Sequence, residues 1–145
     1  MTRKILVAYD GSDLSKHAVD EAKKQVMDSR DGEIHIITVV STTGPVTNAK
    51  MAESVGKELA ERYETEVAAI KKELEKEDPI TVKTKVIVGD AEGNPGERIC
   101  EYAEENDVDI IVIGSRGLGG VKKLLLGSVS NNVVQKASKP VLVIK

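Results

Sequence analysis

The sequence contains few cysteines and almost no aromatic residues, and both shortages exclude classes of protein. Cys100 is the single cysteine among 145 residues, so no internal disulfide can form, which agrees with a reducing compartment. There are three Tyr and no Phe or Trp, so we expect an aliphatic core and no base stacking on aromatic platforms. The net charge of -3 also argues against general affinity for nucleic acids.

A long apolar run is missing as well. No stretch approaches the roughly 20 residues that a membrane-spanning helix needs, and the N-terminal residues lack the apolar region of a signal peptide. The composition, with 40% hydrophobic and 31% charged residues, is that of an ordinary globular protein. We therefore expect a single domain over residues 1–145, in the cytoplasm and without a membrane partner.

Apolar segments alternate with amphipathic ones along the chain. Five segments rich in aliphatic residues predict strands, at residues 5–9, 34–40, 80–88, 108–113 and 141–144. Four segments with helical spacing predict helices, which begin at Ser12 or Asp13, Thr47, Pro95 and Ser128. The second helix should reach about residue 77 with Val55 on its apolar side, and the fourth should reach residue 138 with Val134 on its inner side.

This alternation predicts an α/β fold, a doubly wound and Rossmann-like parallel sheet of five strands with helices on both faces. The first and fourth strands are continuous apolar runs, typical of covered central strands. The third alternates with Lys83 and Lys85, which suits a sheet edge. These features favour the strand order 3-2-1-4-5. Ligands bind where the winding of such a sheet reverses, and the residues just beyond the strand ends there are Asp10 and Gly114.

A glycine-rich segment follows the fourth strand. Gly114 and Gly117 are separated by two residues, and Gly127 and Ser128 follow after nine more, directly before the last predicted helix. Glycines let backbone N–H groups approach an anion, and a helix start adds unpaired donors, so the pattern predicts phosphate binding, with Ser128 placed to cap the helix. The alternative is that the glycines only form tight turns. A P-loop and a dinucleotide fingerprint are excluded by spacing and placement.

Asp10 has three candidate roles: a turn residue, a phosphate acceptor, or a ligand to ribose hydroxyls. Response-regulator receivers share this sheet order, but their acceptor aspartate follows the third strand and their lysine follows the fifth, whereas Lys139 precedes the fifth strand here. A carboxylate accepts hydrogen bonds from sugar hydroxyls, but it would need a metal ion to face phosphates. The ribose role is therefore favoured.

Catalytic and metal-binding patterns are not evident in the sequence. There is no Ser/His/Asp or Cys/His arrangement, and His17 and His35 lack the spacing of metal ligands. We expect His17 on a helix surface and His35 within a strand. No catalytic residue and no protein-held metal are expected.

These residues resemble the universal stress protein family. The likeness is carried by the segment VAYDGS at residues 7–12 and by the block from Gly114 to residue 143, which ends in SKPVLV. In that family the spacing shown by Gly114, Gly117, Gly127 and Ser128 marks the ATP-binding branch. One departure is the loop bounded by Gly89 and Gly96, which is longer than the family's short acidic turn.

The resemblance implies a site for ATP or AMP, with Mg bound through the phosphates. It implies three groups of site residues: Asp10 and Gly114 at the ribose; Gly117, Gly127, Ser128 and Val129 around the phosphates; and Ala8, Ile113 and the backbone of Val39 at the nucleoside and the adenine edge. Family members commonly pair their final strands, so it also implies a homodimer through Val141 to Ile144.

The function implied is that of an ATP-binding universal stress protein, a nucleotide-dependent switch or sensor in a stress response that acts on a downstream protein partner. Little or no ATP hydrolysis is expected, because no residue near the site is an obvious general base. Two alternatives stay open: a dimeric interaction module that needs no nucleotide, and a slow ATP-hydrolysing enzyme of a related nucleotide-binding α/β group.

Overall fold

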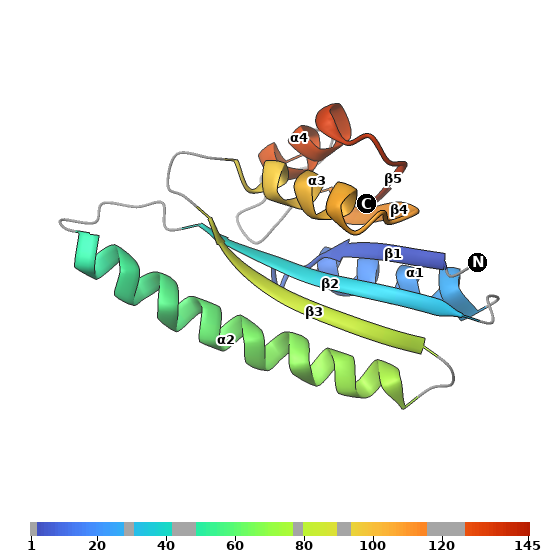
Figure 1. The fold of residues 1–145 in the computed structure, drawn as a ribbon, viewed down its shortest axis with the longest axis horizontal. Coiled ribbons are helices and arrows are strands. Elements are labelled where there is room, and N and C mark those ends of the chain that lie inside the picture. Colours follow the sequence, from blue (N-terminus) through green and yellow to red (C-terminus); the bar gives the residue numbers. More distant parts are fainter. Residues whose placement is uncertain (1–2, 28–30, 42–48, 77–79, 90–93, 116–126) are drawn as a thin grey trace.

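The computed structural model describes residues 3–27, 31–41, 49–76, 80–89, 94–115 and 127–145. Within these ranges strands and helices alternate (Figure 1). In chain order they are β1 (Arg3–Ala8), α1 (Asp13–Met27), β2 (Gly32–Ser41), α2 (Ala49–Glu75), β3 (Ile80–Gly89), α3 (Pro95–Glu105), β4 (Ile110–Gly114), α4 (Ser128–Lys136) and β5 (Val141–Ile144). The predicted α/β class is confirmed.

The five strands form one parallel sheet in the order β3-β2-β1-β4-β5, as predicted. The central position of β1 explains its continuous apolar run, because Ile5, Leu6 and Val7 are fully buried although successive side chains point to opposite faces. Lys83 and Lys85 are exposed on β3, at one edge of the sheet. Charged side chains there discourage pairing with another strand.

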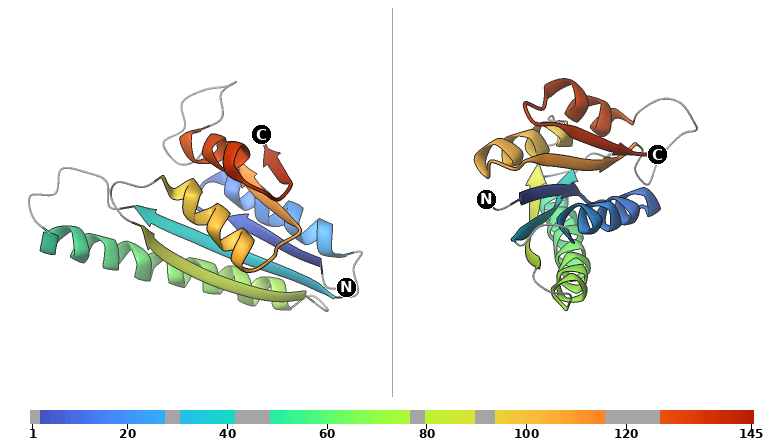
Figure 2. Two further views of the ribbon diagram at one scale, coloured as in Figure 1. Left: turned by 45° about the horizontal axis from the view of Figure 1, so that its top comes forward. Right: turned by 90° about the vertical axis from the view of Figure 1, so that its right-hand side faces the viewer.

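The helices lie on both faces of the sheet, α1 and α2 on one and α3 and α4 on the other (Figure 2). Each face has its own aliphatic core. The core beneath α1 and α2 includes Ile5, Val7, Ile34, Ile36 and Val67. The core beneath α3 and α4 includes Leu6, Ile37, Ile99, Ile111 and Val133. The alternation of β1 side chains between these two cores follows from the period of two of a strand.

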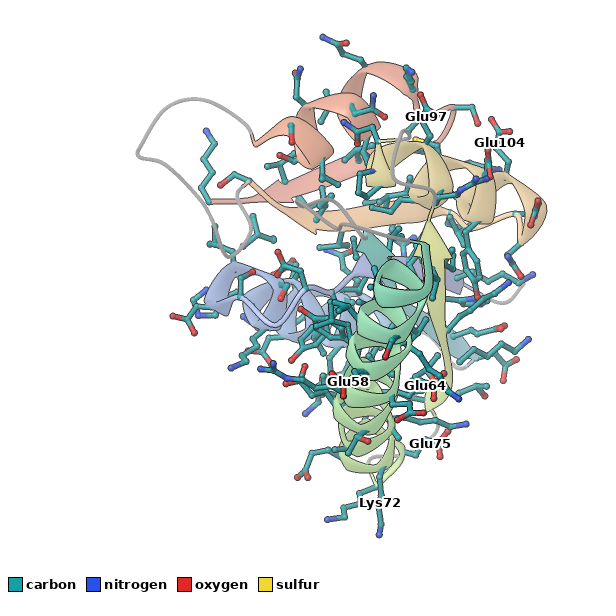
Figure 3. The ribbon with its side chains drawn as sticks, turned by 90° about the vertical axis from the view of Figure 1, so that its left-hand side faces the viewer. Glu58, Glu64, Lys72, Glu75, Glu97 and Glu104 are labelled. Atoms are coloured by element: carbon teal, nitrogen blue, oxygen red, sulfur yellow. The ribbon has the colours of Figure 1, made fainter. Side chains whose placement is uncertain are left out.

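The outer face of α2 is charged (Figure 3). Glu58, Glu64 and Lys72 are exposed on it, and Lys71 lies 3.9 Å from Glu75 across one helical turn. Val55 was predicted on the apolar side but is 46% exposed. The neighbouring Gly56 is buried instead, and successive residues of a helix point about 100° apart, so the inward face of α2 passes through Gly56 rather than through Val55. In the part of the chain that the structure describes, every helix is too short or too polar to cross a bilayer.

Two other details differ from the prediction. β4 begins at Ile110 rather than at Val108, because the N–H of Val108 donates to the carbonyl of Ala103 and still belongs to the closing turn of α3. Val134 is 43% exposed, whereas Val133 is fully buried. Neighbouring residues of a helix point about 100° apart, so only one of these two valines can face the sheet.

A polar cluster, buried except for Lys83, links α3 to β2 and β3. Glu33 Oε1 lies 2.9 Å from both His35 Nε2 and Lys83 Nζ, and His35 Nδ1 lies 2.6 Å from the Tyr102 hydroxyl. Burial lowers the pKa of His35 below its ordinary 6.5, against the opposing attraction of Glu33. Burial alone would raise the pKa of Glu33, but Lys83 and His35 hold it below 4.5. The neutral imidazole then donates to Glu33 and accepts from Tyr102.

We expect the free energy of unfolding to fall as the pH drops below 6.5. The unfolded chain binds the His35 proton near its ordinary pKa, whereas the folded chain resists it, so acid favours unfolding until the lower folded pKa is reached. Glu33 adds a second loss below 4.5, because its folded pKa is also the lower one. Urea unfolding at about pH 7.5 and 5.5 measures the first effect.

The exposed His17 supplies a matched control for this pH dependence. His35→Gln should show a smaller change in stability between the two pH values than the unmodified chain, and His17→Gln should show the same change. The reverse pattern, with the dependence lost in His17→Gln and kept in His35→Gln, would contradict the role given to the buried imidazole.

Candidate functional site

The C-terminal ends of β1 and β4 lie side by side, since Val7 pairs with Val112 in the parallel ladder. From β1 the chain continues to β2 on one side, and from β4 it continues to β5 on the other. The winding therefore reverses between these two strands. Asp10 follows one strand end and Gly114 closes the other, which places both predicted ribose residues at the reversal.

The loop after β1 is held by a backbone hydrogen bond to β2 and by side-chain hydrogen bonds within the loop. The N–H of Tyr9 donates to the carbonyl of Ile37 at 2.8 Å, and Asp10 Oδ1 accepts from the N–H of Ser12 at 2.9 Å. Gly11 has a φ of 84°, a left-handed conformation that favours glycine. Ser12 then caps α1, with its Oγ accepting from the N–H of Ser15 at 3.2 Å. One oxygen of Asp10 therefore takes part in the turn, and its half-buried carboxylate lies beyond the C-terminal end of the central strand β1.

The backbone N–H and carbonyl of Ser115 link β5, the end of β4 and the start of α4. Its N–H donates to the carbonyl of Ile144 in β5 at 2.7 Å. Its carbonyl accepts from the N–H of Gly127 at 2.7 Å and from Ser130 Oγ at 2.9 Å. Both serines are buried. These contacts hold the start of α4 directly beside the end of β4.

The four aliphatic residues of the predicted site share one face of the sheet: Ala8 and Ile113, predicted at the nucleoside, Val39, predicted at the adenine edge, and Val129, predicted at the phosphates. Ala8, Val39 and Val129 are half-buried and pack against the core that contains Ile113, which is 5% exposed. They come from β1, β2, α4 and β4, four elements distant in sequence. The structure thus brings an aliphatic surface together with Gly114 and with the start of α4. Gly117 lies outside the described residues.

The model of the Universal stress protein family matches residues 1–145 of this sequence. The chain belongs to this family. Universal stress protein YxiE of Bacillus subtilis is 34% identical over 151 residues, which cover 100% of each chain. The solved structure of MJ0577, a universal stress protein of Methanocaldococcus jannaschii, has a TM-score of 0.85 at 34% identity and covers 99% of this chain and 95% of that one.

Two further solved structures of universal stress proteins contain adenine nucleotides. A complex with cAMP has a TM-score of 0.61 at 25% identity and covers 99% of this chain and 96% of that one. A complex of the Archaeoglobus fulgidus protein with dAMP has a TM-score of 0.65 at 22% identity and covers 100% and 98%. At 22% identity, the similarity to the dAMP complex is a similarity of fold.

In this universal stress protein the predicted cap at Ser128 is wrong. Gly127 occupies the cap position of α4 without a side-chain hydrogen bond, and Ser128 is the exposed first residue of the helix. The first helical bond runs from the N–H of Asn131 to the carbonyl of Gly127. The N–H groups of residues 128–130 precede that bond and have no carbonyl within the helix to pair with. The Ser128 hydroxyl is thereby left for a role other than capping.

The inward-facing serines of this universal stress protein were missed at the sequence level. Ser115 follows Gly114 and Ser130 comes three residues after Gly127, but serine is common at helix starts, and nothing in the spacing shows that these two serines are the buried ones. Among the described residues no group of three His, Cys, Asp or Glu side chains could hold a metal ion. The donors that the site presents are backbone N–H groups and hydroxyls, which suit an anion.

Proposed function

We propose that this universal stress protein binds ATP and acts as a nucleotide-dependent switch or sensor in a stress response. The observation that carries the proposal is the meeting of Asp10, Gly114 and the start of α4 at the reversal of the sheet. A helix start presents unpaired N–H groups and the positive end of its dipole, both of which favour phosphate. The spacing of Gly114, Gly117, Gly127 and Ser128 adds independent support.

Each group of residues has a proposed role. Asp10 accepts a hydrogen bond from the ribose, beside Gly114. Gly117, Gly127, Ser128 and Val129 surround the phosphates, and a Mg ion is bound through these phosphates rather than by a protein cluster. Ala8 and Ile113 contact the nucleoside, and the backbone of Val39 contacts the adenine edge. The relatives solved with cAMP and dAMP support the adenine nucleotide class.

The proposal includes a homodimer in the cytoplasm. β5 is an edge strand of the sheet, and its four residues Val141–Ile144 are aliphatic and half-buried. Pairing of two such strands would cover their apolar side chains and their open backbone groups. Because phosphate contacts of this kind hold a nucleotide without a general base, we propose slow or absent hydrolysis.

Purification without added nucleotide tests the proposal. We expect mass spectrometry of the heat-released ligand to find ATP or AMP. We also expect ATP with Mg to raise the melting temperature of the nucleotide-free protein, because a ligand at 100 times its Kd stabilises the folded state by about 2.7 kcal/mol. A protein that carries no nucleotide and shows no shift with millimolar ATP would instead be the interaction module that needs none.

A further inference from the structure

Tyr63 of α2 reaches the loop that carries Asp10. Its hydroxyl donates to the backbone carbonyl of Asp10 at 3.1 Å, across 53 residues of sequence. Its ring also lies under Gly11, where an added Cβ would be 3.8 Å from Tyr63 Cε1 and equally far from Glu66 Oε2. A helix on one face of the sheet therefore contacts the residue proposed to hold the ribose.

The surroundings of Tyr63 keep its phenol protonated and available as a donor. Burial, and then the negative charges of Asp10 and Glu66, raise its pKa. Glu66 Oε2 is itself buried and has no hydrogen-bond partner among the described residues. A phenol that must donate, placed beside two carboxylates, has the carbonyl of Asp10 as its acceptor.

The Asp10–Gly11 peptide needs such an external contact. Gly11 lies at φ 84° and has no Cβ to restrict its rotation, so the backbone there is intrinsically permissive. Asp10 Oδ1 is bonded to the N–H of Ser12, which ties the carboxylate to the loop. Whatever fixes this peptide therefore also fixes the direction of the carboxylate.

We propose that Tyr63 is a positioning residue that orients Asp10 toward the ribose hydroxyls of the bound nucleotide. This inference rests on the proposed function. It adds a helix from the other face of the sheet to the nucleotide site, because Tyr63 packs with the core beneath α1 and α2, whereas Ala8 and Val39 pack with the core beneath α3 and α4. Specificity for the sugar then depends on α2.

The test compares ATP with 2′,3′-dideoxy-ATP, which lacks both ribose hydroxyls, by titration calorimetry on nucleotide-free protein. The unmodified chain should bind ATP about tenfold more tightly than the dideoxy analogue, because hydrogen bonds to a charged group are the stronger ones. Tyr63→Phe removes only the hydroxyl and should reduce this preference to about threefold or less. Its affinity for the dideoxy analogue should be unchanged.

Tyr102→Phe is the matched control. It removes a phenol hydroxyl that bonds to His35 on the other face of the sheet, so it should keep the full preference for ATP. Melting temperatures of both variants verify that titrations are run on folded protein. A purely structural role for Tyr63 would weaken both ligands equally and leave their ratio intact.

The outcomes separate this inference from the proposed function. A Tyr63→Phe variant that keeps the preference of the unmodified chain overturns the inference and leaves ATP binding in place. Equal binding of both ligands by the unmodified chain overturns the inference together with the ribose role of Asp10. Binding of neither ligand overturns the proposed function itself.

Discussion

Valine at position 117 is expected to lower the affinity for ATP by about a hundredfold or more, with the fold intact. Gly117 is the second glycine of the motif, and its proposed role is to leave room for backbone N–H groups to approach the phosphates. In that role, a branched side chain would compete with the phosphates for space. Isothermal titration with ATP and Mg measures the loss, and circular dichroism verifies the fold.

Gly119→Val is the matched control for this substitution. Gly119 lies two residues further along the same segment, but it is not one of the glycines that define the motif spacing. The same increase in side-chain size and backbone stiffness at position 119 should therefore lower the affinity for ATP much less. If Gly117→Val binds ATP as tightly as Gly119→Val does, the phosphate role of Gly117 is wrong.

Alanine at position 96 should destabilise the protein by about 1–3 kcal/mol, the usual cost of overpacking. Gly96 is buried in the first turn of α3, where an added Cβ would lie 2.8 Å from Asn132 Oδ1, 2.9 Å from Asn132 Cβ and 3.0 Å from the carbonyl oxygen of Val129. Alanine favours a helix over glycine by about 1 kcal/mol at most. The steric cost should outweigh this gain, because a backbone oxygen and a Cβ cannot swing aside.

Gly89 provides the comparison for Gly96. A Cβ there would meet Val39 Cγ1 at 3.6 Å, an ordinary contact, so Gly89→Ala should change stability by less than about 1 kcal/mol. Gly96→Ala should also weaken ATP binding, because α4 must shift at Val129, in the turn proposed to hold the phosphates. Urea unfolding of both variants measures the change in stability, and titration with ATP measures the change in affinity. Equal stability of the two variants would contradict the close packing of α3 on α4.

Packing of α3 on α4 has a charged rim as well as this tight centre. Lys136 Nζ bonds to Glu97 Oε1 at 2.8 Å, and Ser138 Oγ bonds to Glu104 Oε1 at 3.0 Å. Figure 3 shows both glutamates on the side of α3 toward α4. Lys136 holds the pKa of Glu97 below its ordinary value. Such exposed contacts contribute little stability, so Gly96 is the more sensitive probe of this interface.

Much of the fold could be predicted from local patterns. The continuous apolar run of β1 indicated a central strand, because a strand covered on both faces has apolar residues at every position. Lys83 and Lys85 indicated an edge, because polar residues at alternate positions mark a strand that is covered less completely. That order placed Asp10 and Gly114 at the reversal of the sheet. Of the candidate site, the structure brings Asp10, Gly114 and the start of α4 together; the roles of the site residues toward ATP remain predictions.

Details that depend on competition between neighbours were predicted less well. Local preference predicts Ser128 as the cap of α4, since serine is a common cap, but Gly127 occupies this position, with its N–H held by the carbonyl of Ser115. Val134 was placed inside, although Val133 already fills the inner position. In both cases a contact from another element decided between two residues with nearly equal local preference.

The sequence by itself determined the alternation of strands and helices and the strand order, because both follow from the periodicity of apolar residues. It also determined the family and the glycine spacing, because both follow from motif residues. Only the tertiary structure decided that Tyr63 holds the carbonyl of Asp10, that Ser130 closes on Ser115, and that His35 bonds Tyr102. The physical reason is that these hydrogen bonds join residues 15 to 67 positions apart. Their geometry is set by the packing of whole elements, and no local pattern records it.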